Sequence, residues 1–146
     1  MKACKLIFLA TLAPVTALAG VVEHCPRTND IAVRSSTYVA PTQDGKGEWL
    51  GVTQTGSGGR IVRFEEAIFY PDDAAMGSGS PRGELAKCTY KVEQGVVDLS
   101  YKPSDGARPK VTLENSHAWS KETGPFGLVY YQCAGAPAEH CAFRES

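Results

Sequence analysis

The chain has 146 residues, of which 42% are hydrophobic and 21% charged, and its formal net charge is −1. This length predicts one domain with its own core, and nothing in the charge balance suggests the concentrated positive face that nucleic acids or anionic membranes require. The longest locally basic stretch, 102–110, is interrupted by two prolines and an aspartate, which indicates a solvated loop.

Residues 1–19 have the layout of a bacterial signal peptide. Two lysines precede an apolar run over 6–12, and Ala17-Leu18-Ala19 supplies the small residues of a cleavage site. The apolar run is too short to anchor the chain across a bilayer. We therefore expect an exported protein, periplasmic or secreted, whose mature part is a single domain over 20–146 with no membrane span.

Export makes the cysteines of the mature chain disulfide candidates. Cys4 is removed with the signal peptide, and the four that remain are Cys25, Cys88, Cys133 and Cys141. An even number in an oxidising compartment predicts two disulfides. Cys25–Cys88 with Cys133–Cys141 is favoured, because the segment 134–140 is rich in turn residues and can join two strand ends. The crossed pairing, Cys25–Cys133 with Cys88–Cys141, stays open.

The first half of the mature chain contains short strand-like segments separated by turns. Segments 31–33 and 36–40 are typical of edge strands, and 49–54 and 61–70 are expected to pair as a hairpin through a Gly/Ser linker. The longer strand, 61–70, is expected to bury one face. That face consists of Val62, Phe64, Ile68 and Tyr70, and the step 65–67 is either a bulge or a helical turn.

The second half shows clearer alternation. Apolar and polar residues alternate over 85–92 and again over 96–102, and the residues between them suit a tight turn, so these segments predict a hairpin. The apolar run 128–133 predicts a central strand, and 142–143 is expected to close a final hairpin with it.

Glycine and proline punctuate the chain about every ten residues, and helical signals are scarce. Seven to nine strands with turns at regular spacing predict an all-β fold. The expected architecture is a small antiparallel β-sandwich or flattened barrel with two disulfides.

Catalytic signatures are missing from the sequence: it has no Gly-x-Ser-x-Gly elbow, zinc helix, phosphate loop or Cys-x-x-Cys. The carboxylate pairs Glu65-Glu66 and Asp72-Asp73 suit glycosidic chemistry only within a cleft. The tripeptide Glu-His-Cys occurs at 23–25 and 139–141, and two such segments would resemble a zinc site if their thiols were free. Since disulfides do not bind zinc, we expect no metal site. Because the catalytic and cofactor signatures are missing, we also expect no catalytic residue and no cofactor.

Aromatic residues suggest a binding role instead. Trp49, Trp119 and Tyr131 are candidate partner-binding residues, and Trp49 follows a polar turn that favours partial exposure. Tyr130 and Tyr131 are adjacent, so their rings point to opposite faces of a regular strand. The long loop 72–83 is a second candidate contact element.

The order of several short motifs resembles a known family. These motifs are Cys25-Pro26, Ile31, Tyr38-Val39-Ala40, Trp49-x-Gly51, Gly59-x-Ile61-x-x-Phe64-x-x-Ala67-x-Phe69, Cys88-x-Tyr90, Leu99-x-Tyr101, Trp119, Cys133 and Cys141-x-Phe143. Together they resemble the exported bacterial family called domain of unknown function 3757. The resemblance covers most of the mature chain, implies an exported and disulfide-bonded domain, and brings no catalytic residues.

These observations predict a small exported protein that binds a protein or glycan partner, for example as an inhibitor or immunity protein. One alternative is a secreted hydrolase that acts on polysaccharide through carboxylates and His117. Another alternative is an envelope protein that binds a metal through the two Glu-His-Cys segments. We expect no nucleic-acid partner, and the oligomeric state stays open.

Overall fold

The computed structural model describes residues 20–72 and 79–146, so the expected signal peptide and residues 73–78 of the loop 72–83 lie outside the described residues. The described chain is all-β, with short 3-10 turns and no α-helix in these ranges. Its strands are β1 (Glu23–His24), β2 (Ala32–Arg34), β3 (Thr37–Pro41), β4 (Glu48–Val52), β5 (Gly58–Pro71), β6 (Arg82–Gln94), β7 (Val96–Lys102), β8 (Val111–Leu113), β9 (Ser120–Thr123), β10 (Val129–Ala134) and β11 (Ala142–Glu145).

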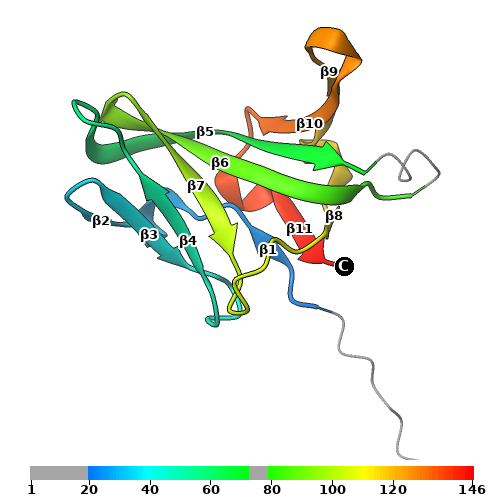
Figure 1. The fold of residues 1–146 in the computed structure, drawn as a ribbon, viewed down its shortest axis with the longest axis horizontal. Coiled ribbons are helices and arrows are strands. Elements are labelled where there is room, and N and C mark those ends of the chain that lie inside the picture. The colour runs from blue at the N-terminus through cyan, green and yellow to red at the C-terminus, as the bar shows by residue number, and fades with distance from the viewer. Residues whose placement is uncertain (1–19, 73–78) are drawn as a thin grey trace, which may run out of the picture.

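All strand pairs are antiparallel and belong to one curled sheet that forks at β6 (Figure 1). One edge of β6 pairs with β5, which continues to β10 and β9. The other edge pairs with β8 at the start of β6 and with β7 near its end. One wing then runs β8–β11–β1 and the other runs β7–β4–β3–β2, so the sheet wraps round the core as a half-barrel. The expected all-β, antiparallel and disulfide-linked class is confirmed.

The hairpin expected from 85–92 and 96–102 is confirmed as β6 and β7. Its turn is closed by a hydrogen bond of 3.1 Å from the Val92 amide to the Gly95 carbonyl. The alternation is confirmed as well, because Cys88, Tyr90, Val92 and Leu99 have no exposed area and Val97 is buried. In these two strands, every second residue is apolar, and the apolar residues form the buried face.

The face expected for 61–70 is wrong in part. Ile68 is buried and Phe64 is half-buried against the core, as expected. Val62 and Tyr70 are instead 53% and 42% exposed, and Ala67 and Phe69 are fully buried. Register shifts interrupt the β5–β6 ladder, including one between Phe64 and Glu66, which identifies the step at 65–67 as a bulge. Each bulge on β5 inserts one residue and moves the following side chains to the other face of the sheet.

Two expected pairings are also wrong. β4 pairs with β3 and β7 instead of forming a hairpin with β5, and β11 pairs with β1 and β8 instead of β10. The β10 strand does have neighbours on both sides, β5 and β9. Both errors assume that strands adjacent in sequence pair with each other, which the fork at β6 prevents.

Aromatic rings close the space between the two wings. Trp49 from β4 packs on Tyr101 from β7 and on Phe143 from β11, with ring centroids 5.3 and 6.1 Å apart. The Trp49 indole nitrogen donates a 3.4 Å hydrogen bond to the buried carboxylate of Glu23 in β1. Trp49 has no exposed area, so the expectation of partial exposure is wrong; strand alternation places it inside although its neighbour Glu48 is exposed.

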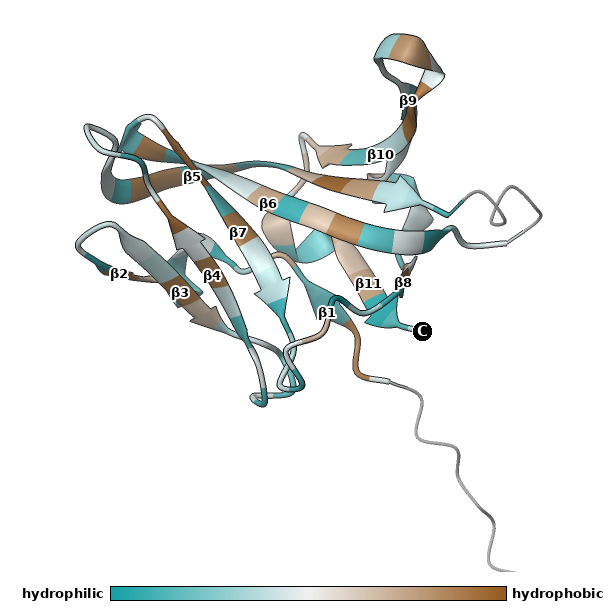
Figure 2. Ribbon diagram, viewed as in Figure 1, coloured by the Kyte–Doolittle hydropathy of each residue, from teal (hydrophilic) through white to brown (hydrophobic). Residues whose placement is uncertain are grey.

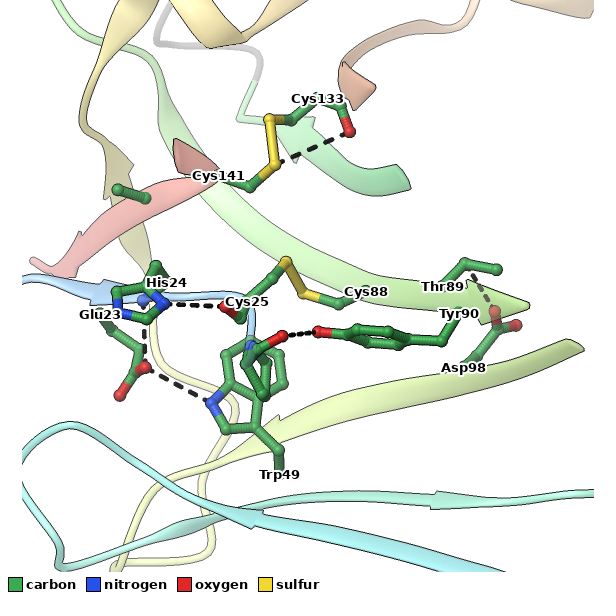
Figure 3. The surroundings of a disulfide bond; sticks show 12 residues. Glu23, His24, Cys25, Trp49, Cys88, Thr89, Tyr90, Asp98, Cys133 and Cys141 are labelled. Atoms are coloured by element: carbon green, nitrogen blue, oxygen red, sulfur yellow. Dashed lines mark hydrogen bonds between the residues drawn. A yellow bond between two sulfur atoms is a disulfide. The ribbon is translucent and has the colours of Figure 1, made fainter. Parts of the chain in front are cut away.

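The favoured disulfide pairing is confirmed: Cys25 is bonded to Cys88 and Cys133 to Cys141 (Figure 3). All four cysteines are fully buried. The first bond ties the segment after β1 to the middle of β6, and the second ties β10 to the residue that precedes β11. In the described ranges, no helix is long and apolar enough to cross a membrane.

Candidate functional site

The most conspicuous surface feature is the hairpin formed by β9 and β10, which projects from the body of the sheet (Figure 1). Its inner half is anchored, because residues from Tyr131 to Ala134 pair with β5. The outer half extends past that ladder, and there β10 pairs in the described chain with β9 alone, through Val129↔Thr123 and Tyr130↔Glu122. The hairpin therefore presents its tip away from the rest of the described chain.

The tip is the 3-10 turn Pro125–Gly127, called η4. Its central residues, Phe126 and Gly127, both have positive φ, 60° and 75°. The Leu128 amide donates a 3.3 Å hydrogen bond to the Pro125 carbonyl, and the Gly124 amide donates a 2.7 Å bond to the Leu128 carbonyl. Two consecutive left-handed residues closed in this way resemble a type I′ turn, which matches the twist of paired strands.

Phe126 does not suit this turn. The first central position of a type I′ turn favours asparagine, aspartate or glycine, because left-handed backbone raises the conformational energy of most other residues. The other non-glycine residues with positive φ in the described ranges are Ser35 and Asn115, both small and polar. A bulky ring at this position costs about 1–2 kcal/mol relative to ordinary backbone.

The tip also exposes its apolar side chains. Phe126 has a relative exposure of 108% and Leu128 of 53%, and the tip is apolar in Figure 2. A single exposed apolar residue is ordinary on a protein surface. Here a fully exposed ring coincides with unfavourable backbone at the end of a projecting hairpin, and neither property helps the isolated domain fold. Local strain that the fold does not need is a signal of function.

The root of the hairpin is rigid. Tyr131 packs edge-on against the buried Phe69, with ring centroids 6.0 Å apart, and Phe69 in turn packs against Trp119. Cys133 closes its disulfide two residues further along β10. Such a root holds the tip in place, which lowers the entropy lost when the tip binds a partner.

None of the three sequence-predicted binding residues lies on the tip. Trp49 is fully buried, Trp119 is 7% exposed, and Tyr131 is half-buried against Phe69. Tyr130, which pairs with Glu122 across the hairpin, is also half-buried. Trp49 and Trp119 thus serve the core in this structure, and Trp119 and Tyr131 support the hairpin from below.

The two Glu-His-Cys segments meet in space. β1 pairs with β11, and the Cys25 amide donates a 3.2 Å hydrogen bond to the Cys141 carbonyl. Both cysteines are in disulfides, so neither offers a thiolate to a metal. In residues 20–72 and 79–146, no three His, Cys, Asp or Glu side chains are arranged to hold a metal ion.

The side chains considered for hydrolysis lie on separate elements. Glu66 is on β5, where it accepts a hydrogen bond from the amide of Gln132, and His117 is on the turn η3 (Ser116–Ala118). No hydrogen bond or ion pair in the described part of the chain brings Glu66 and His117 together.

Sequence reasoning missed the tip. The segment Gly124-Pro125-Phe126-Gly127 contains the signal, because it places turn residues around an aromatic between two strand-like segments. Such a pattern alone does not reveal whether the ring turns back to the core.

Comparison with known proteins gives one match. The sequence model of the family described as "Protein of unknown function (DUF3757)" matches residues 20–144. No curated protein and no solved structure matches this chain.

Proposed function

Because the chain belongs to the DUF3757 family of proteins of unknown function, we propose a role for it from its geometry: an exported module that binds a protein partner through the tip of the β9–β10 hairpin. The observation that carries this proposal is the full exposure of Phe126 in a backbone conformation that disfavours it. Two buried disulfides support export, since such bonds persist in oxidising compartments.

The chemistry of the tip favours a protein over a glycan or a lipid surface. Residues 124–129 carry no polar side chain, whereas a sugar site needs hydrogen-bonding groups around its aromatic platform. The charged side chains of the whole hairpin, 120–134, are Lys121 and Glu122, which cancel. An anionic membrane therefore finds no basic cluster to attract it. An apolar pocket on a protein surface fits a projecting ring and its leucine neighbour.

A second copy of the chain fits the hairpin poorly. The free edge of β9 is four residues long. In an antiparallel pair, residues directly opposite each other point to the same face of the sheet. When a two-fold axis relates two β9 edges, Lys121 therefore lies opposite Lys121 of the other copy, or Glu122 opposite Glu122. Like charges directly opposite each other destabilise a strand pair. The partner is therefore a different protein.

The test is site-specific photo-crosslinking in cells that export the protein. A photoreactive phenylalanine analogue replaces Phe126 in one variant and Val62 in the control, which is 53% exposed on another part of the sheet. We expect a discrete protein adduct from position 126 that is absent from position 62. Excess unlabelled wild-type protein should suppress the adduct, and an excess of the Phe126→Ala variant should not. Equal adducts at both positions, or equal suppression by the two competitors, would refute the proposal.

A further inference from the structure

A cavity of about 150 Å³ lies next to the first described residue. Its lining residues are Gly20, Val21, Glu23, Asp44, Tyr101 and Glu145. The segment that leads into β1 thus meets the β3–β4 loop, β7 and β11 at this cavity. Three of the six lining residues carry a carboxylate.

The carboxylate of Glu23 is the most buried of the three, with 5% relative exposure. It accepts hydrogen bonds from the amides of His24 and Gln43, at 3.0 and 2.8 Å, and from the Trp49 indole. Burial raises the pKa of Glu23, because removal from water disfavours its charged form. A cation beside this group would offset that cost.

The other two carboxylates are fixed at the rim. Glu145 accepts a 2.5 Å hydrogen bond from the Tyr101 hydroxyl. Asp44 accepts a 2.6 Å bond from the Thr42 hydroxyl and a 2.9 Å bond from the Lys46 amide, and these bonds lower the pKa of Asp44. Neutral amide, hydroxyl and indole groups orient the three carboxylates. Because these donors carry no charge, the cavity keeps a negative charge.

Gly20 is held at this cavity. The Arg144 guanidinium donates a hydrogen bond to the Gly20 carbonyl, and a β-carbon built on Gly20 would lie 3.8 Å from the Glu145 carbonyl. The match to the family also begins at residue 20, directly after the small-residue signature Ala17-Leu18-Ala19. The family match and the expected cleavage site thus agree on residue 20.

We propose that removal of the signal peptide after Ala19 creates an ammonium group on Gly20 that occupies this cavity and pairs with Glu23, Asp44 and Glu145. A signal peptidase hydrolyses the Ala19–Gly20 bond with one water, which leaves a carboxylate on Ala19 and an amine on Gly20. The amine is protonated at neutral pH. The uncut precursor has an uncharged amide there, so processing adds an ion pair that the precursor lacks.

This inference rests on the export part of the proposed function and is independent of the hairpin. The inference implies that the mature domain is more stable than the precursor, which has to cross a membrane before it folds. The titratable groups that line the cavity beside the amine are Glu23, Asp44, Tyr101 and Glu145, with Lys46 close to Asp44 and Arg144 bound to the Gly20 carbonyl.

The experiment uses the full chain, expressed with its own leader in an exporting bacterial host. Intact mass identifies the N-terminus of the recovered protein, and NMR of its 13C-dimethylated amines gives the pKa of the α-amine. We expect Gly20 as the first residue and an α-amine pKa raised by one pH unit or more above its ordinary value of about 8. Asp44→Asn and Glu145→Gln should each lower it, whereas Glu93→Gln, at the distant β6–β7 turn, should not.

A stability measurement completes the test. A variant with one alanine inserted before Gly20 moves the ammonium by one residue, and mass confirms its new start. A raised amine pKa stabilises the fold fully below pH 8 and less as the pH rises through the folded value. At pH 6 we therefore expect the unfolding constant of the inserted variant to be about tenfold larger than that of the mature domain, with the difference gone near pH 11. An ordinary amine pKa at Gly20, or a difference that does not depend on pH, would refute the pocket; a different first residue would refute the cleavage site.

Discussion

Replacement of Phe126 by asparagine should make the protein more stable and less able to bind. The backbone at this position is left-handed, with φ 60° and ψ 23°. An aromatic residue pays about 1–2 kcal/mol for that conformation, and asparagine pays substantially less. Because the ring is fully exposed, its removal loses no packing in the isolated domain. The net gain should be about 1 kcal/mol, equivalent to a rise of about 4 °C in melting temperature for a domain of this size.

The matched control is Ser35→Asn. Ser35 also has a positive φ, 55°, and lies in the turn between β2 and β3, away from the β9–β10 hairpin. Both variants should melt at a higher temperature in a calorimeter, and only Phe126→Asn should lose the partner adduct seen in photo-crosslinking. A Phe126→Asn domain that melts several degrees lower would refute the argument, because it would mean that the ring supports the fold.

Two further substitutions test packing inside the sheet. Removal of the Tyr90 hydroxyl by Tyr90→Phe leaves the buried Pro26 carbonyl without its 2.5 Å hydrogen bond and should cost about 1–3 kcal/mol in urea unfolding; an unchanged midpoint would contradict this. Gly83→Ala should unfold far more easily than the control Gly124→Ala, because its β-carbon would lie 2.0 Å from the Tyr70 carbonyl; equal midpoints would count against the pairing of β5 and β6.

The two disulfides should contribute unequally. Chain entropy assigns about 4 kcal/mol to Cys25–Cys88, which spans 63 residues, and about 2.5 kcal/mol to Cys133–Cys141, which spans 8. All four sulfurs are fully buried, so each double alanine variant loses similar packing and the comparison isolates loop length. Urea titrations of the two double variants should differ by about 1.5 kcal/mol, and the reverse order would contradict the entropic account.

Where local patterning alone decides the structure, the sequence was sufficient. The alternation around Cys88 and Leu99 predicted β6, β7 and their buried face, and the turn-rich segment before Cys141 favoured the observed disulfide. In β5 the same reasoning failed. The bulges between Ile61 and Glu66 depend on pairing with β6, and no residue pattern within the segment predicts them.

The candidate site was beyond sequence reasoning for a similar reason. Trp49 and Phe126 both follow turn-like residues, yet one is fully buried and the other fully exposed. The difference is set by neighbouring strands: β4 has β3 on one side and β7 on the other, while the outer part of β10 has only β9. Exposure of an aromatic ring thus depends on tertiary pairing between distant segments.

The most direct test of the binding account is the affinity of the protein identified from the position-126 adduct. Burial of a phenylalanine ring in an apolar pocket contributes about 2 kcal/mol or more, which corresponds to about 30-fold in the dissociation constant. In isothermal titration calorimetry, Phe126→Ala should therefore bind at least about 30-fold more weakly than the wild type, and Val62→Ala should bind almost unchanged. A Phe126→Ala protein that binds as tightly as the wild type would contradict the account.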